Sequence, residues 1–305
     1  MNELSKKVLE FFQVRKTRKQ KLSFIEFIKE NVPDARVEEG GLIKCRNIVI
    51  GDPDKAKAVF TAHYDTCAML PFPNLIFPRN IFFSILYNVL IVLPFVAVIP
   101  LCQLTLFRGI DSFLLRYWIS LFIFIGLFLF VFIFGIPNRH TANDNTSGVI
   151  SVLELYARLS PEERDKCAFV LFDHEETGLI GSKFFKKKHP ETAKNTLLIN
   201  LDCVGDGDNL LLVIPKAAKG YEDLLRDSFN HTGENKLNLL ICDAGTTFYP
   251  SDQARFPKGV GVAALHRKKF WGYYMGRIHT AWDTVCEEKN ISFVTEGLLS
   301  FVAKL

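Results

Sequence analysis

The segment CAFVLFDHEE, residues 167–176, decides the fold of this 305-residue chain. Its first six residues are apolar without polar alternation, the pattern of a strand that is buried on both faces. Further strand-like runs fall at residues 47–50, 58–62, 196–201, 210–214, 237–241 and 260–265. Helical patterns precede, separate and follow them, at residues 4–14, 22–32, 147–159 and 291–305. This order predicts an α/β fold, with a mixed, largely parallel central sheet flanked by helices on both faces.

Acidic and histidine side chains stand where these strands run out. They are His63, Asp65, Glu175, Glu176 and Asp202, with Asp144 in the turn before a helix. Any one of them alone is explained as a turn or cap residue. Sheets of this kind bind ligands beyond the carboxyl ends of their strands, and burying several carboxylates together is costly unless cations neutralise them. The sequence therefore predicts a metal site at this edge of the sheet.

The side chains at this edge also narrow the chemistry. Imidazole and carboxylate ligands without thiolates suit zinc, with manganese or cobalt as substitutes. Two metals about 3.5–4 Å apart need a bridging ligand, which a carboxylate can supply. The adjacent Glu175 and Glu176 fit a division in which one binds metal and the other acts as a base. Asp65 is expected to accept the second imidazole N–H of His63.

Hydrophobicity is concentrated between residues 76 and 136. Two uncharged spans, at about 81–101 and 118–136, each approach the roughly 20 residues that cross a bilayer core as a helix. The second span lacks the polar face of a soluble helix, whereas Pro94 and Pro100 weaken the first. We expect a transmembrane helical hairpin, residues 74–137, inserted into one discontinuous domain of residues 1–73 and 138–305.

A hairpin with a short tip places both soluble flanks on one side of the bilayer. Arg79, Arg139 and the basic N-terminal segment favour the cytoplasmic side, although Arg108 and Arg116 at the tip weaken the count of positive charges. The first 20 residues have no apolar signal-peptide core, and seven cysteines without CxxC spacing indicate buried free thiols in a reducing compartment. We expect an integral membrane protein whose soluble domain and termini are cytoplasmic.

The net charge of +4 is mild, and the basic runs at residues 15–21 and 186–188 are interpreted as solvated faces. No nucleic-acid partner is expected. The lipid bilayer is the expected partner of residues 76–137.

Six blocks extend the pattern across almost all the soluble sequence. In order they are TAHYDT (61–66), NDNTSGV (143–149), FDHEETGLIGS (172–182), NLDCVG (200–205), SDQARF (251–256) and IHTAWDT (278–284). Each block alone is weak, but their combination and order resemble the co-catalytic di-zinc exopeptidases, metallopeptidase family 28. That family includes bacterial aminopeptidases, glutamate carboxypeptidase-like enzymes and glutaminyl cyclases.

The resemblance implies a two-zinc site and a role for each residue. His63, Asp144 and Asp202 would hold one metal. Asp144, Glu176 and His279 would hold the other, so that Asp144 bridges the pair. Glu175 would be the general base, and Asp65 would orient His63. The implied activity is that of an aminopeptidase acting on a peptide substrate, here anchored to a membrane.

The sequence departs from the family pattern in three places. The family usually has a short loop between the counterparts of Asp65 and Asp144, whereas here the two are 79 positions apart and the hairpin fills the gap. Gln253 stands where many relatives carry His near the substrate pocket. No tyrosine precedes His279, so an oxyanion donor would have to be Tyr249, Tyr273 or Tyr274.

Three alternatives remain open. The first is a glutaminyl cyclase or a carboxypeptidase on the same scaffold, and such cyclases typically use one zinc. The second is a catalytically inactive membrane receptor or scaffold, although such members tend to lose metal ligands and this chain keeps them all. The third, a transporter, is disfavoured because the two spans carry no charge for an ion path.

Overall fold

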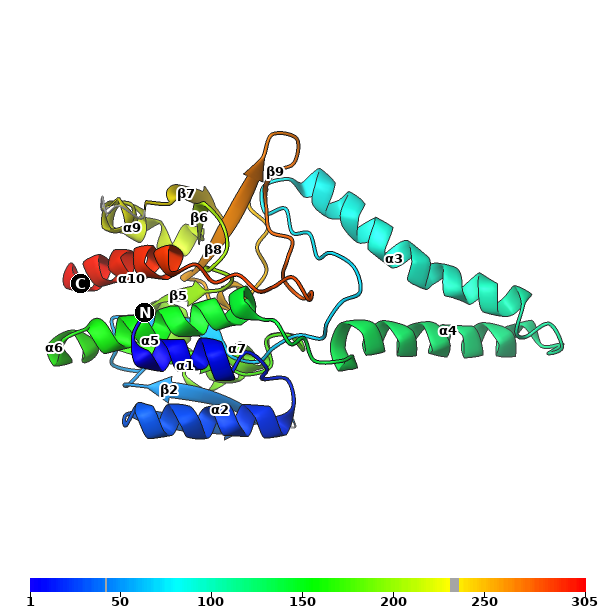
Figure 1. The fold of residues 1–305 in the computed structure, drawn as a ribbon, viewed down its shortest axis with the longest axis horizontal. Coiled ribbons are helices and arrows are strands. Elements are labelled where there is room, and N and C mark those ends of the chain that lie inside the picture. Colours follow the sequence, from blue (N-terminus) through cyan, green and yellow to red (C-terminus); the bar gives the residue numbers. More distant parts are fainter. Residues whose placement is uncertain (42, 231–235) are drawn as a thin grey trace.

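The computed structural model describes residues 1–41, 43–230 and 236–305. Within these residues nine strands form one mixed sheet, in the order β1-β2-β4-β3-β5-β8-β6-β7 with β9 paired to β8 (Figure 1). The strands are β1 (Ala35–Gly40), β2 (Cys45–Ile50), β3 (Ala58–His63), β4 (Cys167–Phe172), β5 (Leu197–Leu201), β6 (Asn209–Ile214), β7 (Asn238–Asp243), β8 (Gly259–Lys268) and β9 (Gly272–Tyr274). The α/β fold predicted from the sequence is confirmed.

The centre of the sheet is parallel. Strand β3 runs parallel to both β4 and β5, and β5 runs parallel to β8. Antiparallel pairings lie further out, between β1 and β2, β2 and β4, and β6 and β8. The carboxyl ends of β3, β4 and β5 therefore meet at one edge. The sequence pattern did not predict β1, whose segment ARVEEG carries three charges, or the three-residue β9.

Helices cover both faces of the sheet because the central strands are apolar on both sides. In β4, Phe169 and Leu171 pack into one core, and Val170 and Phe172 into the opposite one. The first core is covered by α1 (Glu3–Phe11), α2 (Arg18–Asn31), α5 (Gly148–Arg158), α9 (Glu222–Phe229) and α10 (Glu288–Ala303). The second is covered by α7 (Ile180–Lys188) and α8 (Pro190–Asn195). Short segments α6 (Pro161–Arg164), η3 (Lys216–Tyr221) and η4 (Asp252–Arg255) complete the connections.

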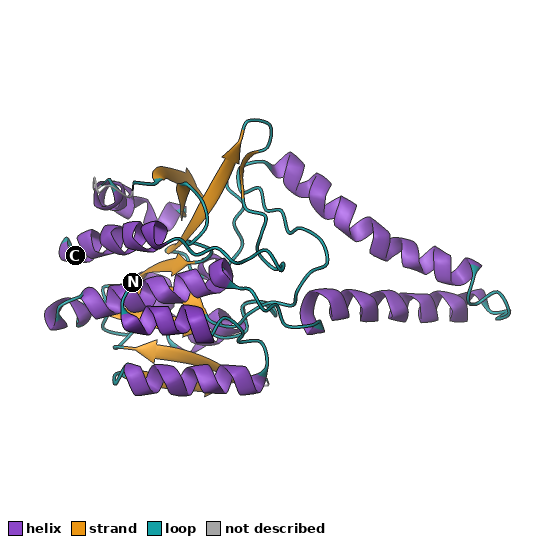
Figure 2. Cartoon of the chain, viewed as in Figure 1, coloured by secondary structure: helices purple, strands orange, loops and turns teal. Residues whose placement is uncertain are grey.

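Two long apolar helices project from this domain. They are α3 (Ile81–Leu104) and α4 (Phe113–Leu129), the latter continued by η1 (Phe130–Phe134). Both are long and apolar enough to cross a membrane, and only 6% of the residues in each apolar window are buried. Figure 2 shows them extending together, away from every strand of the sheet. The second helix begins at Phe113, five residues before the predicted span, because the Ser112 side chain accepts the Leu115 N–H and caps it there.

The hairpin leaves and re-enters the domain through paired backbone. Met69 N–H donates to the Ile136 carbonyl at 2.8 Å, and Ala68 bridges Pro137. Further along the outgoing segment, Ile76 and Met275 exchange two backbone hydrogen bonds, of 3.0 and 3.1 Å. These hydrogen bonds join the outgoing segment to the returning one and to the rest of the domain.

All seven cysteines lie in the described residues and are free thiols. Six are buried, and Cys286 is partly exposed. The prediction of free, mostly buried thiols is confirmed.

Candidate metal centre

The predicted site residues converge at the carboxyl edge of the parallel strands. His63 is the last residue of β3, Glu175 and Glu176 follow β4, and Asp202 follows β5. Two further residues arrive from loops: Asp144 from the segment η2 (Ala142–Ser147), just before α5, and His279 from the chain after β9. These six residues and Asp65, the seven singled out in the sequence, therefore lie close together.

The first predicted ligand set is compact and buried. The Nε2 atom of His63 lies 3.3 Å from Oδ1 of Asp144 and 3.5 Å from Oδ1 of Asp202. Each of the three side chains is less than a tenth exposed. One imidazole nitrogen and two carboxylate oxygens thus point at a common position, as a divalent cation requires.

The second set begins at the other oxygen of Asp144. Oδ2 of Asp144 lies 2.9 Å from Nε2 of His279, which lies 3.3 Å from Oε2 of Glu176. The remaining oxygen of Glu176, Oε1, is buried and has no hydrogen-bond partner among the described residues. Because Asp144 turns one oxygen to each histidine and Glu176 keeps an unused one, the residues present fit a pair of cations bridged by Asp144.

The electrostatics of the cluster point the same way. Burial raises the pKa of Glu176 to about 8, and Asp144 adds to this effect. Burial alone would lower the pKa of His279, but Glu176 and Asp144 raise it to about 9. Burial likewise raises the pKa of Glu175 well above its ordinary value, against the opposing effect of His63. The cluster holds more carboxyl groups than its two histidines can balance. Bound cations would supply the missing positive charge.

Asp65 contacts His63 chiefly through its backbone, whereas the sequence led us to expect its carboxylate as the acceptor. Its carboxylate accepts the backbone N–H groups of Glu175 and Glu176, at 2.9 and 3.2 Å. The Nδ1 atom of His63 lies 3.1 Å from the backbone carbonyl of Asp65 and 3.7 Å from its carboxylate. The turn after β3 therefore orients His63 through its backbone, and the Asp65 side chain holds the loop that carries both glutamates.

Two buried carboxylates near the site were not predicted. The carboxylate of Asp283 accepts the N–H groups of Asn143 and Asp144, at 2.8 and 3.0 Å, and so fixes the backbone of the bridging residue. Asp252 is fully buried, and neither of its oxygens has a hydrogen-bond partner among the described residues. Both lie in sequence blocks quoted above, so the signal was present, but their burial beside the site arises only from the folded loops.

The interpretation of Arg15 as a solvated residue was wrong. It stands in a basic run interpreted as a solvated face, yet it is fully buried. Its guanidinium donates to the carbonyl of Tyr64 and, at 3.1 Å, to the hydroxyl of Thr146. Burial lowers the pKa of Arg15 to about 10, against the opposing effect of Asp65 and Asp144. This arginine thus links the turn after His63 to the turn after Asp144.

Cys67 also lies beside the second ligand set. Its sulfur, an oxygen of Glu176 and a ring nitrogen of His279 fall within 4.8 Å of one another. Burial raises the pKa of Cys67 well above its ordinary value, and the nearby carboxylates add to the effect. Without a bound cation a thiol in this environment stays protonated, and the two predicted ligand sets consist of imidazole and carboxylate groups.

A pocket of about 170 Å³ opens onto both ligand sets. Asn74 and Ile76, on the segment that leads into α3, form part of its wall. Of the three candidate tyrosines only Tyr249 lines this pocket, and its hydroxyl already donates to the Asp202 carbonyl at 2.9 Å. Gln253 lies outside the pocket lining and bonds the Tyr249 carbonyl and the Asn200 side chain instead.

Comparisons with known proteins bear on the fold and on the family. The structure resembles the glutaminyl cyclases of Porphyromonas gingivalis (TM-score 0.60, 14% identity, covering 99% of this chain and 96% of that one) and Tannerella forsythia (0.60, 16%, 99% and 98%). It also resembles the LapA aminopeptidase of Legionella pneumophila (0.56, 13%, 99% and 68%). At these identities the likeness concerns the fold. Comparison with curated protein sequences gives no match.

The family is shown by the sequence itself. The sequence model of peptidase family M28 matches residues 133–297, just over half of the chain. The match contains Asp144, Glu175, Glu176, Asp202 and His279, and it begins at residue 133, near the end of the hairpin that separates them from His63. This protein therefore belongs to peptidase family M28.

Proposed function

We propose that the protein is a membrane-anchored, metal-dependent exopeptidase of the aminopeptidase type. The observation that carries this proposal is the position of Asp144, whose two oxygens lie 3.3 Å from His63 and 2.9 Å from His279. This geometry suits two metal ions, for which we propose zinc, with manganese or cobalt as substitutes. His63 and Asp202 complete one ligand set, and Glu176 and His279 complete the other.

The chain supplies a proton carrier beside these ligands. When bound, a metal pair polarises the scissile carbonyl and lowers the pKa of a bound water. Glu175 is buried, and its raised pKa suits a group that takes the water proton and returns it to the leaving amine. The hydrogen bond from Glu175 N–H to the Asp65 carboxylate, at 2.9 Å, fixes the backbone from which the Glu175 side chain extends.

The pocket over the ligand sets suits the terminal residue of a peptide substrate. Its volume of about 170 Å³ is small, and Ile76, Met275 and Ile278 form an apolar wall. The carboxylates of the site line the same pocket and would attract the ammonium group of a free N-terminus. A single terminal residue of a peptide fits this combination better than an extended internal segment does.

The two apolar helices support anchoring in a bilayer. Phe270, 77% exposed at the β8–β9 turn, packs against Phe83 in the first turn of α3, at 5.4 Å between ring centroids. The neighbouring Trp271 and Lys268 are of the type that gathers at a membrane surface. Arg79 and Arg139 lie close to the two ends of the insertion, and we propose that the domain and both termini are cytoplasmic.

Cleavage of matched peptides tests this proposal. Purified full-length protein, loaded with zinc, is offered one peptide with a free amino terminus and the same peptide acetylated. The proposal expects release of the first residue from the free peptide alone. Equal cleavage of both peptides would overturn the aminopeptidase assignment, and cyclisation of an N-terminal glutamine without cleavage would replace it with the glutaminyl cyclase alternative.

A further inference from the structure

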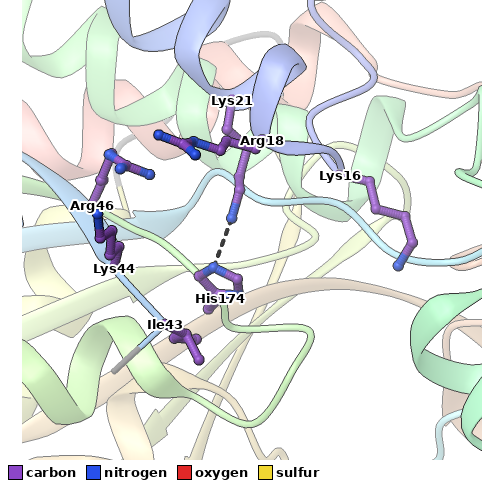
Figure 3. A pocket seen from close by; sticks show the side chains of 7 residues that line it. All are labelled: Lys16, Arg18, Lys21, Ile43, Lys44, Arg46 and His174. Carbon is purple, nitrogen blue, oxygen red and sulfur yellow. Dashed lines mark hydrogen bonds between the residues drawn. The ribbon is translucent and has the colours of Figure 1, made fainter. Parts of the chain in front are cut away.

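A second pocket, of about 380 Å³, lies between the start of α2 and strand β2 (Figure 3). Five cationic side chains line it, together with His174 and Ile43; they are Lys16, Arg18, Lys21, Lys44 and Arg46. No carboxylate is among its lining residues in the described chain. We call it the basic pocket, and it is separate from the pocket over the ligand sets.

Only part of this positive charge is balanced. Lys21 pairs with Asp173 at 2.7 Å, and Arg46 pairs with Glu39 at 2.6 Å. The side chains of Arg18 and Lys44 have no ion pair and no hydrogen bond within the described residues. The amino terminus of the 14-residue helix α2 adds its own positive end to the same place. These unpaired positive charges are therefore available to bind an anion.

Hydrogen bonds on both ring nitrogens fix the tautomer of His174, which lines the basic pocket. The Lys21 ammonium can only donate, so the Nε2 atom of His174, 2.9 Å away, must accept (Figure 3). The other ring nitrogen then carries the proton and donates to Thr177, at 2.9 Å. The buried Lys21 is thus held in position, and the exposed Arg18 and Lys44 stay free.

The basic pocket lies beside the base of the apolar hairpin. Lys16 donates a hydrogen bond from Nζ to the carbonyl of Ile133, in the last turn of the second apolar helix. In Figure 1 the chain between α1 and α2 lies on the side of the domain from which α4 extends. If the hairpin crosses a bilayer as proposed, this position is level with the lipid headgroups on the side of the soluble domain.

We infer that the basic pocket binds a phosphate group. Several Lys and Arg side chains around a pocket whose described lining holds no carboxylate, next to a helix amino terminus, are an arrangement that recognises phosphate. The pocket is wide enough for a headgroup, and its place beside the hairpin assigns it to the phosphomonoester of an anionic lipid. That lipid source rests on the proposed membrane anchoring, whereas free phosphate has the same chemistry and is separated from it by the test.

The test measures binding to full-length protein in detergent with three probes. The probes are short-chain phosphatidic acid, short-chain phosphatidylcholine and inorganic phosphate, and native mass spectrometry or thermophoresis gives the affinities. The variant R18A/K44A removes the two unpaired cations. The matched control K29A/K187A removes two exposed charges, one at the other end of α2 and one on α7.

The inference expects phosphatidic acid to bind more tightly than phosphatidylcholine, with a loss of about tenfold or more in R18A/K44A and no change in K29A/K187A. Tight binding of phosphatidic acid without inorganic phosphate supports the lipid source, and equal binding of both supports a site for free phosphate. Equal affinities of R18A/K44A and the control, or of the two lipids, would overturn the inference.

Binding and hydrolysis are read separately. Both double variants should keep the wild-type rate on a soluble aminoacyl substrate without added lipid, because neither pair touches the ligand sets. Hydrolysis without lipid binding would refute the basic pocket alone. Lipid binding without hydrolysis would refute the proposed enzyme activity and leave the pocket assigned.

Discussion

The backbone N–H of Asn138 donates a hydrogen bond to the carbonyl of Cys67 at 3.2 Å, although 71 residues separate the two. The side-chain amide of Asn138 also donates to the carbonyl of Thr280 at 2.9 Å. Thr280 directly follows His279, and Leu70 N–H donates to the His279 carbonyl at 2.7 Å. Closure of the hairpin and placement of the second histidine ligand therefore share the same buried contacts.

Replacing Asn138 should weaken both the fold and the metal site. In Asn138→Ala the carbonyl of Thr280 loses one of its two buried hydrogen bonds and keeps the one from Asp283 N–H, which costs about 0.5–1.5 kcal/mol. His279 then loses part of its support. We expect a lower Tm and faster loss of metal on dialysis against a chelator. Asn195→Ala, which removes a surface contact to Glu191, is the control. Identical metal loss in the two variants would contradict the link.

Glu175→Gln should separate metal binding from turnover. The substitution keeps the size of the side chain but removes the base, so kcat should fall about 10²- to 10⁴-fold. Metal content should be unchanged, because Glu175 belongs to neither predicted ligand set. The exposed Glu162→Gln serves as control for the loss of one negative charge. A variant with full activity would remove Glu175 from the proposed chemistry.

Replacing residues 81–134 by a flexible linker should separate anchoring from the rest of the protein. The pairing of Met69 with Ile136 and of Ile76 with Met275 lies outside the deleted part, so the pocket wall stays. We expect a protein that no longer needs detergent, keeps its metal and cleaves short soluble peptides. The comparison to make is kcat/KM for soluble and for membrane-tethered peptides. A selective loss on tethered peptides would assign the hairpin a role in substrate access, and an equal rate on both would leave anchoring alone.

The sequence predicted those parts of the molecule that local patterns specify. β4 was placed from its apolar run, and His63 and Asp202 were placed because each follows such a run. The hydrogen bonds that the Asp65 carboxylate accepts from Glu175 and Glu176 could not be predicted, because the direction of a carboxylate depends on the loop that folds over it. Arg15 looked solvated because its partners, Tyr64 and Thr146, lie far along the chain.

The basic pocket was missed for the same physical reason. Its cations come from two segments, residues 16–21 and 44–46, which are separated in the sequence and meet only when α2 packs beside β2. Each segment alone has the composition of a solvated surface. Charge clusters assembled by tertiary packing carry no local signature, whereas strands and apolar helices do.

Counting metal ions per chain tests the central claim most directly. Mass spectrometry of the metal in purified wild-type protein should give two zinc ions per chain. Asp202→Asn should keep one, because only the first ligand set is damaged. Asp144→Asn should lose both, since it breaks the shared bridge. One metal ion in the wild type, or an Asp144→Asn variant that retains two, would contradict the bridged two-metal site.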